Sequence, residues 1–158
     1  MRRTIAPTAL VFVLATVFVV GVAPTAQADD HKDCSAASLQ GSFGFTSTGN
    51  LLAIPAPFAG TFAEIGRQTF DGNGNTEGTA TATANGNLNH LTFKGTYVVN
   101  PDCTGSMTFH VDQLNATVTL DLVIDDDGAE LRAIITGNVP GNTETREYRK
   151  QFSKGKDK

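Results

Sequence analysis

The chain has 158 residues, and its 12 basic and 16 acidic side chains give a formal net charge of −4 at pH 7. A protein that binds nucleic acid would show a basic face, so this charge excludes nucleic acid as the expected partner. The length suits a single folded domain.

Residues 1–28 have the pattern of a signal peptide. Arg2 and Arg3 precede an apolar run over residues 9–22, and Ala26 and Ala28 are the small residues that a signal peptidase reads. The apolar run is too short for a comfortable membrane span. We therefore expect cleavage near Ala28, a secreted or periplasmic location, and no membrane span in the mature chain.

Cleavage after Ala28 would create an amino terminus that reads Asp29-Asp30-His31-Lys32, which resembles the Asp-Ala-His-Lys start of serum albumins. The free amine, two backbone amides and the His31 imidazole would surround Cu²⁺ or Ni²⁺ with four nitrogens in a plane. Asp29 and Asp30 would add favourable charge. The sequence thus predicts a metal site at Asp29, Asp30 and His31, either physiological or adventitious, and no other cofactor.

The two cysteines, Cys34 and Cys103, are expected to form a disulfide in an exported chain. Their pairing closes a loop of about 70 residues, which is worth about 4 kcal/mol in the chain-entropy treatment. A redox pair or a thiolate metal site is not favoured, because the sequence has no Cys-x-x-Cys and no histidine at ligand spacing. The disulfide would tie the segment 29–40 to the middle of the fold.

Residues 41–153 are rich in Thr, Val, Phe and Gly and alternate between apolar and polar side chains, a pattern typical of short strands. The expected strands cover residues 41–47, 61–70, 76–86, 89–99, 104–113, 115–124, 129–137 and 143–152. Residues 35–40 suit one helical turn, the two prolines in 50–60 indicate a loop or lid, and 154–158 read as a disordered basic tail. An all-β fold follows: an eight-stranded antiparallel meander closed as a small barrel, with a β-sandwich as the alternative.

The interior of such a barrel is either filled by side chains or left open for one small ligand. The third strand alternates Thr with Ala, so one wall would carry only small side chains. Filling by phenylalanines is the favoured outcome, because empty apolar space is costly. If space remains, the candidate ligand contacts on the inward faces are Phe62, Phe93, Tyr97 and Phe109.

The stretch from Asp71 to Ala82 has two interpretations. Asp71, Asn73 and Asn75 are spaced like the start of a calcium loop, but Thr76 replaces the required glycine and Ala82 replaces the bidentate glutamate. The glycines between them supply the positive φ of a hairpin turn. We expect a turn.

No complete catalytic set is present: the sequence lacks Gly-x-Ser-x-Gly, His-Glu-x-x-His and a phosphate loop. Glu64 lies an even number of positions from Phe62 and Phe70 on the same strand, so the three share parity and are expected to point to the same, inward face. This makes Glu64 a weak candidate for a base. A structural ion pair is favoured over that role. Its candidate partners are Arg67, Arg132 and Arg146. His90 and His110 have the opposite parity and are expected to face solvent.

The segments "CSAASLQGSFGF", "FDGNGN" and "FKGTYVVNPDCTGSMTF" resemble a group of small exported bacterial proteins of uncharacterised role, over Cys34 to Phe109. The overall plan is similar to calycin-like and allene-oxide-cyclase-like barrels, an analogy of architecture that implies no activity. Lipocalins and avidins carry signature tryptophans, whereas this chain has no tryptophan.

These features predict a secreted, non-enzymatic β-barrel that binds a small apolar molecule or serves an envelope or surface role. The alternative is an enzyme, an isomerase or cyclase in which the barrel positions a lipid-like substrate and Glu64 moves a proton.

Overall fold

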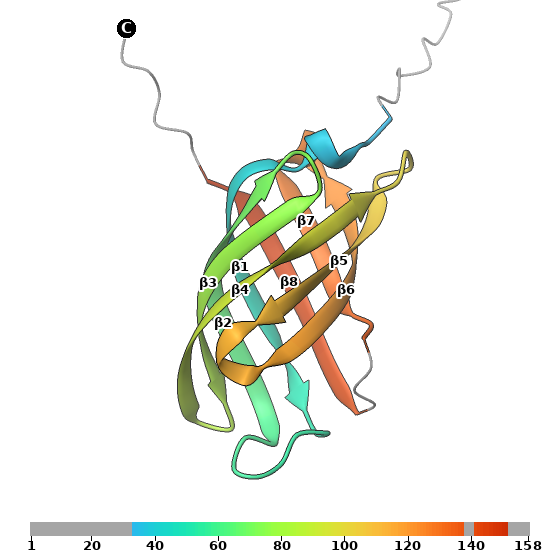
Figure 1. Ribbon diagram of the computed structural model, residues 1–158. Coiled ribbons are helices and arrows are strands. Elements are labelled where there is room, and N and C mark those ends of the chain that lie inside the picture. The colour runs from blue at the N-terminus through green and yellow to red at the C-terminus, as the bar shows by residue number, and fades with distance from the viewer. Residues whose placement is uncertain (1–32, 138–140, 152–158) are drawn as a thin grey trace, which may run out of the picture. The chain divides into compact units, whose positions relative to one another are not determined.

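The computed structural model describes residues 33–137 and 141–151, so the predicted signal peptide, the metal site at Asp29 to His31 and the tail 154–158 lie outside the described residues. Within the described part, eight antiparallel strands follow one another around a closed barrel, and the last strand pairs with the first (Figure 1). The predicted closed barrel is confirmed, and the β-sandwich alternative is wrong.

The strands lie where the alternating segments predicted them. Their bounds are β1 (Gln40–Leu51), β2 (Gly60–Asp71), β3 (Asn75–Ala84), β4 (Asn87–Val99), β5 (Thr104–Val111), β6 (Ala116–Asp125), β7 (Glu130–Ile135) and β8 (Asn142–Lys150). Three short 3₁₀ turns accompany them among the described residues: η1 (Ala36–Ser38), η2 (Asp112–Leu114) and η3 (Asp126–Gly128). The predicted helical turn after Cys34 is η1, and the proline-containing loop occupies residues 52–59.

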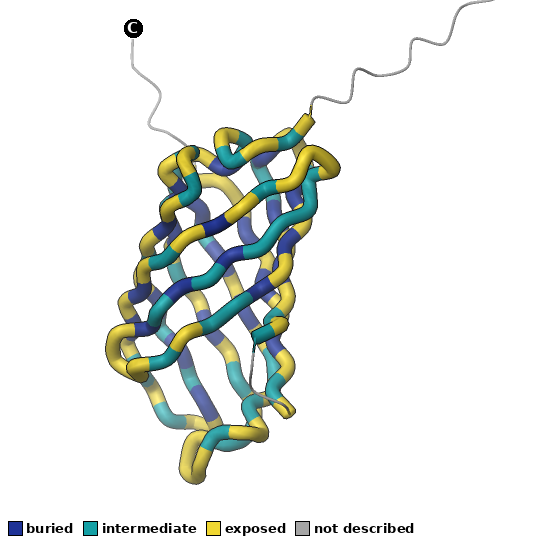
Figure 2. The backbone as a smooth tube through the Cα atoms, turned by 45° about the vertical axis from the view of Figure 1, so that its right-hand side comes forward, coloured by how far each residue is buried: buried dark blue, intermediate teal, exposed yellow. Residues whose placement is uncertain are grey.

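Buried and exposed positions alternate along the strands, because successive side chains of a strand point to opposite faces (Figure 2). The inward faces are those that parity predicted. On β4 and β5, for example, the buried residues are Leu91, Phe93, Tyr97, Met107, Phe109 and Val111.

Two ends of the barrel can be told apart (Figure 1). The disulfide end holds Cys34, η1 and the turns at 72–74, 100–103 and 126–129. The loop end holds the connections at 52–59, 85–86 and 112–115, together with residues 136, 137 and 141.

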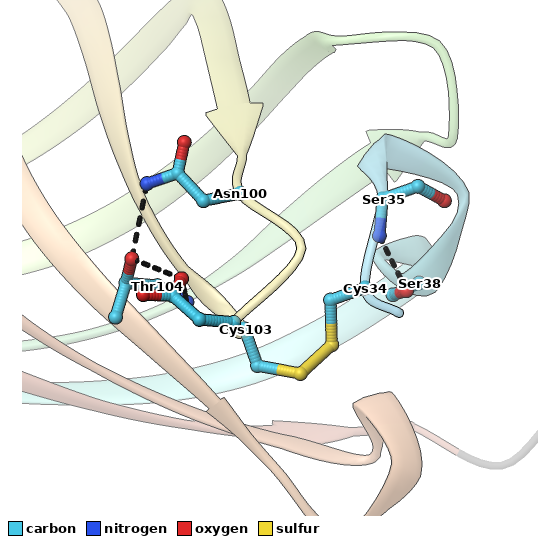
Figure 3. Close-up of a disulfide and its surroundings, with 7 residues drawn as sticks. Cys34, Ser35, Ser38, Asn100, Cys103 and Thr104 are labelled. Carbon is cyan, nitrogen blue, oxygen red and sulfur yellow. Dashed lines mark hydrogen bonds between the residues drawn. A yellow bond between two sulfur atoms is a disulfide. The ribbon is translucent and has the colours of Figure 1, made fainter. Parts of the chain in front are cut away.

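The disulfide end is closed by the segment before β1. Cys34 is bonded to Cys103, as predicted (Figure 3). The side chain of Leu39 is fully buried, and the Tyr97 hydroxyl donates toward the carbonyl oxygens of Ala36 and Leu39, each 2.9 Å away. The chain therefore covers this end of the interior with its own residues.

Aromatic rings fill the middle and the disulfide half of the interior. Phe43 packs edge-on against Phe70 with ring centroids 5.4 Å apart, and Phe70 packs in the same way against Tyr97 at 5.2 Å. Edge-to-face pairs of this kind are favourable beyond the area that they bury.

Two glycines make room for the phenyl rings of neighbouring strands. Phe45 lies opposite Gly66, and Phe93 lies opposite Gly78. A Cβ atom at Gly66 would come within 2.7 Å of the Phe45 ring, and one at Gly78 within 2.5 Å of the Phe93 ring. The thin wall that the sequence predicted for the third strand is therefore partly covered by the ring of Phe93 from β4.

Candidate functional site

Glu64 points into the barrel, as its parity predicted, and only 6% of its surface is exposed. The register explains its neighbours, because β1 pairs with both β2 and β8: Ser47 of β1 lies opposite Glu64 on one side and Arg146 on the other. Inward side chains of three adjacent strands thus meet at one level of the interior.

Arg146 is the ion-pair partner of Glu64. Its Nη2 lies 3.0 Å from Oε2 of Glu64, and its Nε donates to Oε1 of Glu144. The Ser47 hydroxyl donates to the same Glu144 oxygen at 2.8 Å. We call Ser47, Glu64, Glu144 and Arg146 the interior charge cluster. The other two candidate partners, Arg67 and Arg132, are exposed, and Arg132 pairs with Asp125 on the outside.

The guanidinium of Arg146 also lies over two phenyl rings. Its Cζ is 5.1 Å from the ring centroid of Phe45 on β1 and 5.0 Å from that of Phe109 on β5. These cation–π contacts compensate part of the cost of burying the charge.

Two polar atoms of the cluster lack a hydrogen-bond partner among the described residues: Nη1 of Arg146 and Oε2 of Glu64. The short contact between Glu64 Oε2 and Arg146 Nη2 is an ion pair without hydrogen-bond geometry. Buried polar atoms without partners are rare in folded proteins, and such atoms often mark a functional site.

The cluster holds two carboxyl groups for one guanidinium, which sets its electrostatics. Burial raises the pKa of Glu64 to about 7, the positive charge of Arg146 lowers that pKa in part, and Glu144 raises it. Burial acts to lower the pKa of Arg146. The negative charges of Tyr148, Glu144 and Glu64 raise that pKa by more than burial lowers it, so it lies above its ordinary value. The cluster therefore holds a permanent cation and a carboxyl group that can gain or lose a proton near neutral pH.

Sequence reasoning did not identify Ser47 and Glu144 as members of the site. A signal for both was present. Glu144 and Arg146 share parity with the buried Tyr148, and Ser47 shares parity with the buried Phe45. Polar residues at inward positions of a strand are unusual enough to be read as a site.

The four candidate ligand contacts do not gather at one place. Tyr97 lies at the disulfide end, and Phe93 and Phe109 pack together in the middle of the barrel with centroids 4.9 Å apart. Phe62 is partly exposed and lies next to the loop 52–59. Of the four, Phe62 is the residue that faces the loop end.

Exposure of the interior positions rises toward the loop end. Toward the disulfide end, inward side chains such as Phe43 and Leu131 are completely buried. Toward the loop end, Ala84, Val111 and Glu144 are still buried, but several other inward positions are only partly buried. They are Leu51, Phe62, Asn89, Val118 and Ile135. Solvent thus reaches the interior from the loop end.

The rim of the loop end is apolar and nearly uncharged. Large exposed apolar side chains come from three different connections and their flanks: Leu52, Phe58, Leu88 and Leu114. Asp112 is the one charged residue among the described residues of these connections. The turns of the disulfide end, in contrast, carry several aspartates. They include Asp102, Asp126 and Asp127.

A shallow groove of about 850 Å³ lies on the outer face across β4 to β8. Its lining includes the exposed apolar side chains of Val98, Val123 and Ile134. This groove is open to solvent, and of the interior charge cluster only Arg146 is among its lining residues.

The stretch from Asp71 to Asn75 is a turn, as predicted. Gly72 and Gly74 have φ values of 79° and 99°, and Oδ1 of Asp71 accepts hydrogen bonds from the backbone N–H groups of Asn73 and Asn75. Among the described residues, no group of three His, Cys, Asp or Glu side chains could hold a metal ion, and no helix is long and apolar enough to cross a membrane.

No protein-family description matches this chain, and no curated protein matches it. Solved structures of designed barrels do match. A redesigned beta barrel shares 18% identity at a TM-score of 0.53, covering 74% of this chain and 95% of its own. The redesigned barrel mFAP1, bound to DFHBI, shares 16% sequence identity at a TM-score of 0.52, and the match covers 73% of this chain and 97% of that one. EF1p2_mFAP2b, also bound to DFHBI, shares 16% sequence identity at a TM-score of 0.52, and the match covers 73% of this chain and 96% of that one. At these identities the likeness concerns the fold alone.

Proposed function

We propose that this chain is an exported, non-enzymatic binding protein that takes a small, largely apolar molecule into the loop end of its barrel. The signal-peptide pattern of residues 1–28 supports export, and the disulfide is compatible with an oxidising compartment. Two designed barrels of similar architecture are bound to DFHBI, which supports one small ligand per barrel as a use of this fold.

The contrast between the two ends is the observation that carries the proposal. The disulfide end is covered by the chain itself and its turns carry aspartates, whereas the loop end combines an apolar rim with partly exposed inward positions. Apolar side chains that surround an opening favour the passage of an apolar molecule, because its surface leaves water on the way in. Mouths of β-barrels are common ligand sites.

The wall of β3 supports the same location. Its inward residues toward the loop end are Ala80, Ala82 and Ala84, whose side chains are the smallest that a strand can present besides glycine. A ligand that enters past Phe62 would lie against this wall and reach the interior charge cluster, because Ala82 lies opposite Glu64.

Tryptophan fluorescence tests the proposal directly, because the chain has no tryptophan of its own. Phe62→Trp places an indole at the inward edge of the loop end. Ile65→Trp, three residues along β2, places one on the outer face, where Ile65 is 63% exposed. Methyl octanoate serves as the apolar probe.

Emission of the Phe62→Trp variant is expected to move to shorter wavelength and to saturate as methyl octanoate is added, while the Ile65→Trp variant does not change. Adding Ala84→Leu to the first variant should weaken the response, since the larger side chain fills the space at the wall. The proposal fails if neither variant responds, or if both respond equally.

The raised pKa of Glu64 favours a second candidate function, an isomerase or cyclase that acts on a lipid-like substrate. A buried carboxyl group with a pKa of about 7 is suited to proton transfer at neutral pH. Chromatography and mass spectrometry of molecules that co-purify with the mature protein separate the two functions. Recovery of the compound unchanged after incubation supports binding, whereas conversion to an isomer, lost in Glu64→Gln, supports the enzyme.

A further inference from the structure

We propose that Glu64 and Arg146 select a ligand whose head group is neutral and carries a carbonyl next to an N–H, as in a carboxamide or a lactam. This inference rests on the proposed function and names the class of ligand that the loop end would take.

The hydrogen bonds within the interior charge cluster converge on one oxygen of Glu144. Oε1 of Glu144 accepts from the Ser47 hydroxyl and from Nε of Arg146. Two fully buried atoms, the donor Nη1 of Arg146 and the acceptor Oε2 of Glu64, have no hydrogen-bond partner among the described residues. A buried donor and a buried acceptor without partners in the same ion pair are complementary to a group that offers one of each.

The surroundings of the guanidinium restrict the direction of approach. The ring centroids of Phe45 on β1 and Phe109 on β5 lie 5.1 and 5.0 Å from its Cζ, and Glu144 occupies the Nε edge. The edge that carries Nη1 is left for a ligand. Nη1 and Nη2 are joined through Cζ, just as the oxygen and nitrogen of a carboxamide are joined through one carbon. The carbonyl would accept from Nη1, and the N–H would donate to Oε2 of Glu64.

The charges of the cluster argue against a charged head group. When Glu64 is ionised, a carboxylate would add a third negative group to two glutamates that share one guanidinium. An ammonium has only donors, so it would leave Nη1 of Arg146 without an acceptor. The first leaves an excess of like charge and the second an unpaired polar atom, and both are unfavourable in a water-poor interior. A neutral head group avoids both costs.

Isothermal titration calorimetry with four probes that share one alkyl chain tests the selection. Octanamide carries the carbonyl and the N–H, methyl octanoate carries a carbonyl without a donor, octanoate is anionic and octylamine is cationic. Octanamide is expected to bind about tenfold more tightly than methyl octanoate, the effect usual when a buried polar group gains its partner. Octanoate and octylamine should bind more weakly still.

The matched variants are Glu64→Gln and Glu77→Gln, the second on the exposed outer face of β3. Glu64→Gln keeps the shape of the side chain and loses the negative acceptor, so the tenfold preference for octanamide over methyl octanoate should vanish. Glu77→Gln should leave it unchanged. Equal binding of all four probes, or tightest binding of octanoate, would overturn the head-group inference and leave the proposed function standing. Failure of every probe to bind would overturn the proposed function as well.

Discussion

Glu64→Gln is expected to stabilise the folded protein at pH 8 and to leave its stability nearly unchanged near pH 4. Burial raises the pKa of Glu64 from its ordinary value of 4.5 to about 7 in the folded protein. Between these two values the folded chain holds a proton that the unfolded chain has lost. The free energy of unfolding therefore falls as the pH rises from about 4.5 to about 7, and it levels off above that range.

The size of the effect follows from the same pKa values. Each pKa unit corresponds to about 1.36 kcal/mol, so a rise from 4.5 to about 7 costs the folded wild type about 3 kcal/mol at pH 8. A glutamine at this position is neutral at every pH and leaves Arg146 paired with Glu144. The variant should therefore be more stable than the wild type by up to about 3 kcal/mol above pH 7.

Urea denaturation of both proteins at several pH values between 4 and 8 measures this difference. Other titrating groups are present in both proteins and cancel when the two free energies of unfolding are subtracted. The exposed Glu77→Gln serves as the control, and its difference from the wild type should not depend on pH. A Glu64→Gln protein that is less stable than the wild type at pH 8 would contradict this expectation, because it would mean that the ionised Glu64–Arg146 pair is a net stabilising contact.

Three further outcomes are expected. Replacing Cys34 and Cys103 together by alanine should lower the free energy of unfolding by about 4 kcal/mol, since the disulfide closes a loop spanning 69 residues; two free thiols in the native protein would contradict the bond itself. Gly95→Ala should lower the free energy of unfolding by about 3 kcal/mol or more, because the new Cβ would lie 2.0 Å from a backbone oxygen of β5. Gly44→Ala should lower it little, because the nearest atom to its Cβ is 3.6 Å away. Equal losses of stability in thermal melts of the two variants would contradict this expectation. Copper titration of the mature protein should produce a visible d–d band that is lost in His31→Ala, and a band that survives that substitution would rule out the amino-terminal site.

Parity along the strands accounts for much of what could be predicted. A strand in a small barrel has one buried face, so alternation in "NHLTFKGTYVV" is enough to place Leu91, Phe93 and Tyr97 inside. The turn at 71–75 was equally readable, because Gly72 and Gly74 supply positive φ and the Asp71 carboxylate accepts from the backbone that follows it. Both features are local, and local chemistry determines them.

The interior charge cluster is not local, which is why the sequence alone left its composition open. Glu64 and Arg146 are far apart in the chain and meet because β1 lies between their strands with Ser47 opposite both. Parity already places Arg67 and Arg132 outside, so Arg146 was the partner that a stricter use of the pattern would have chosen. The difference between the two ends, in contrast, depends on how the connections assemble around the closed barrel and has no counterpart in any single segment.

The measurement that most directly tests binding at the loop end is a titration of the ¹⁵N-labelled mature protein with methyl octanoate, followed by backbone amide NMR. Saturable shifts are expected at Leu51, Phe62 and Ala84, with no change at Leu39 in the disulfide end. Shifts confined to Val123 and the rest of the outer groove, or no saturable shift at any amide, would contradict it.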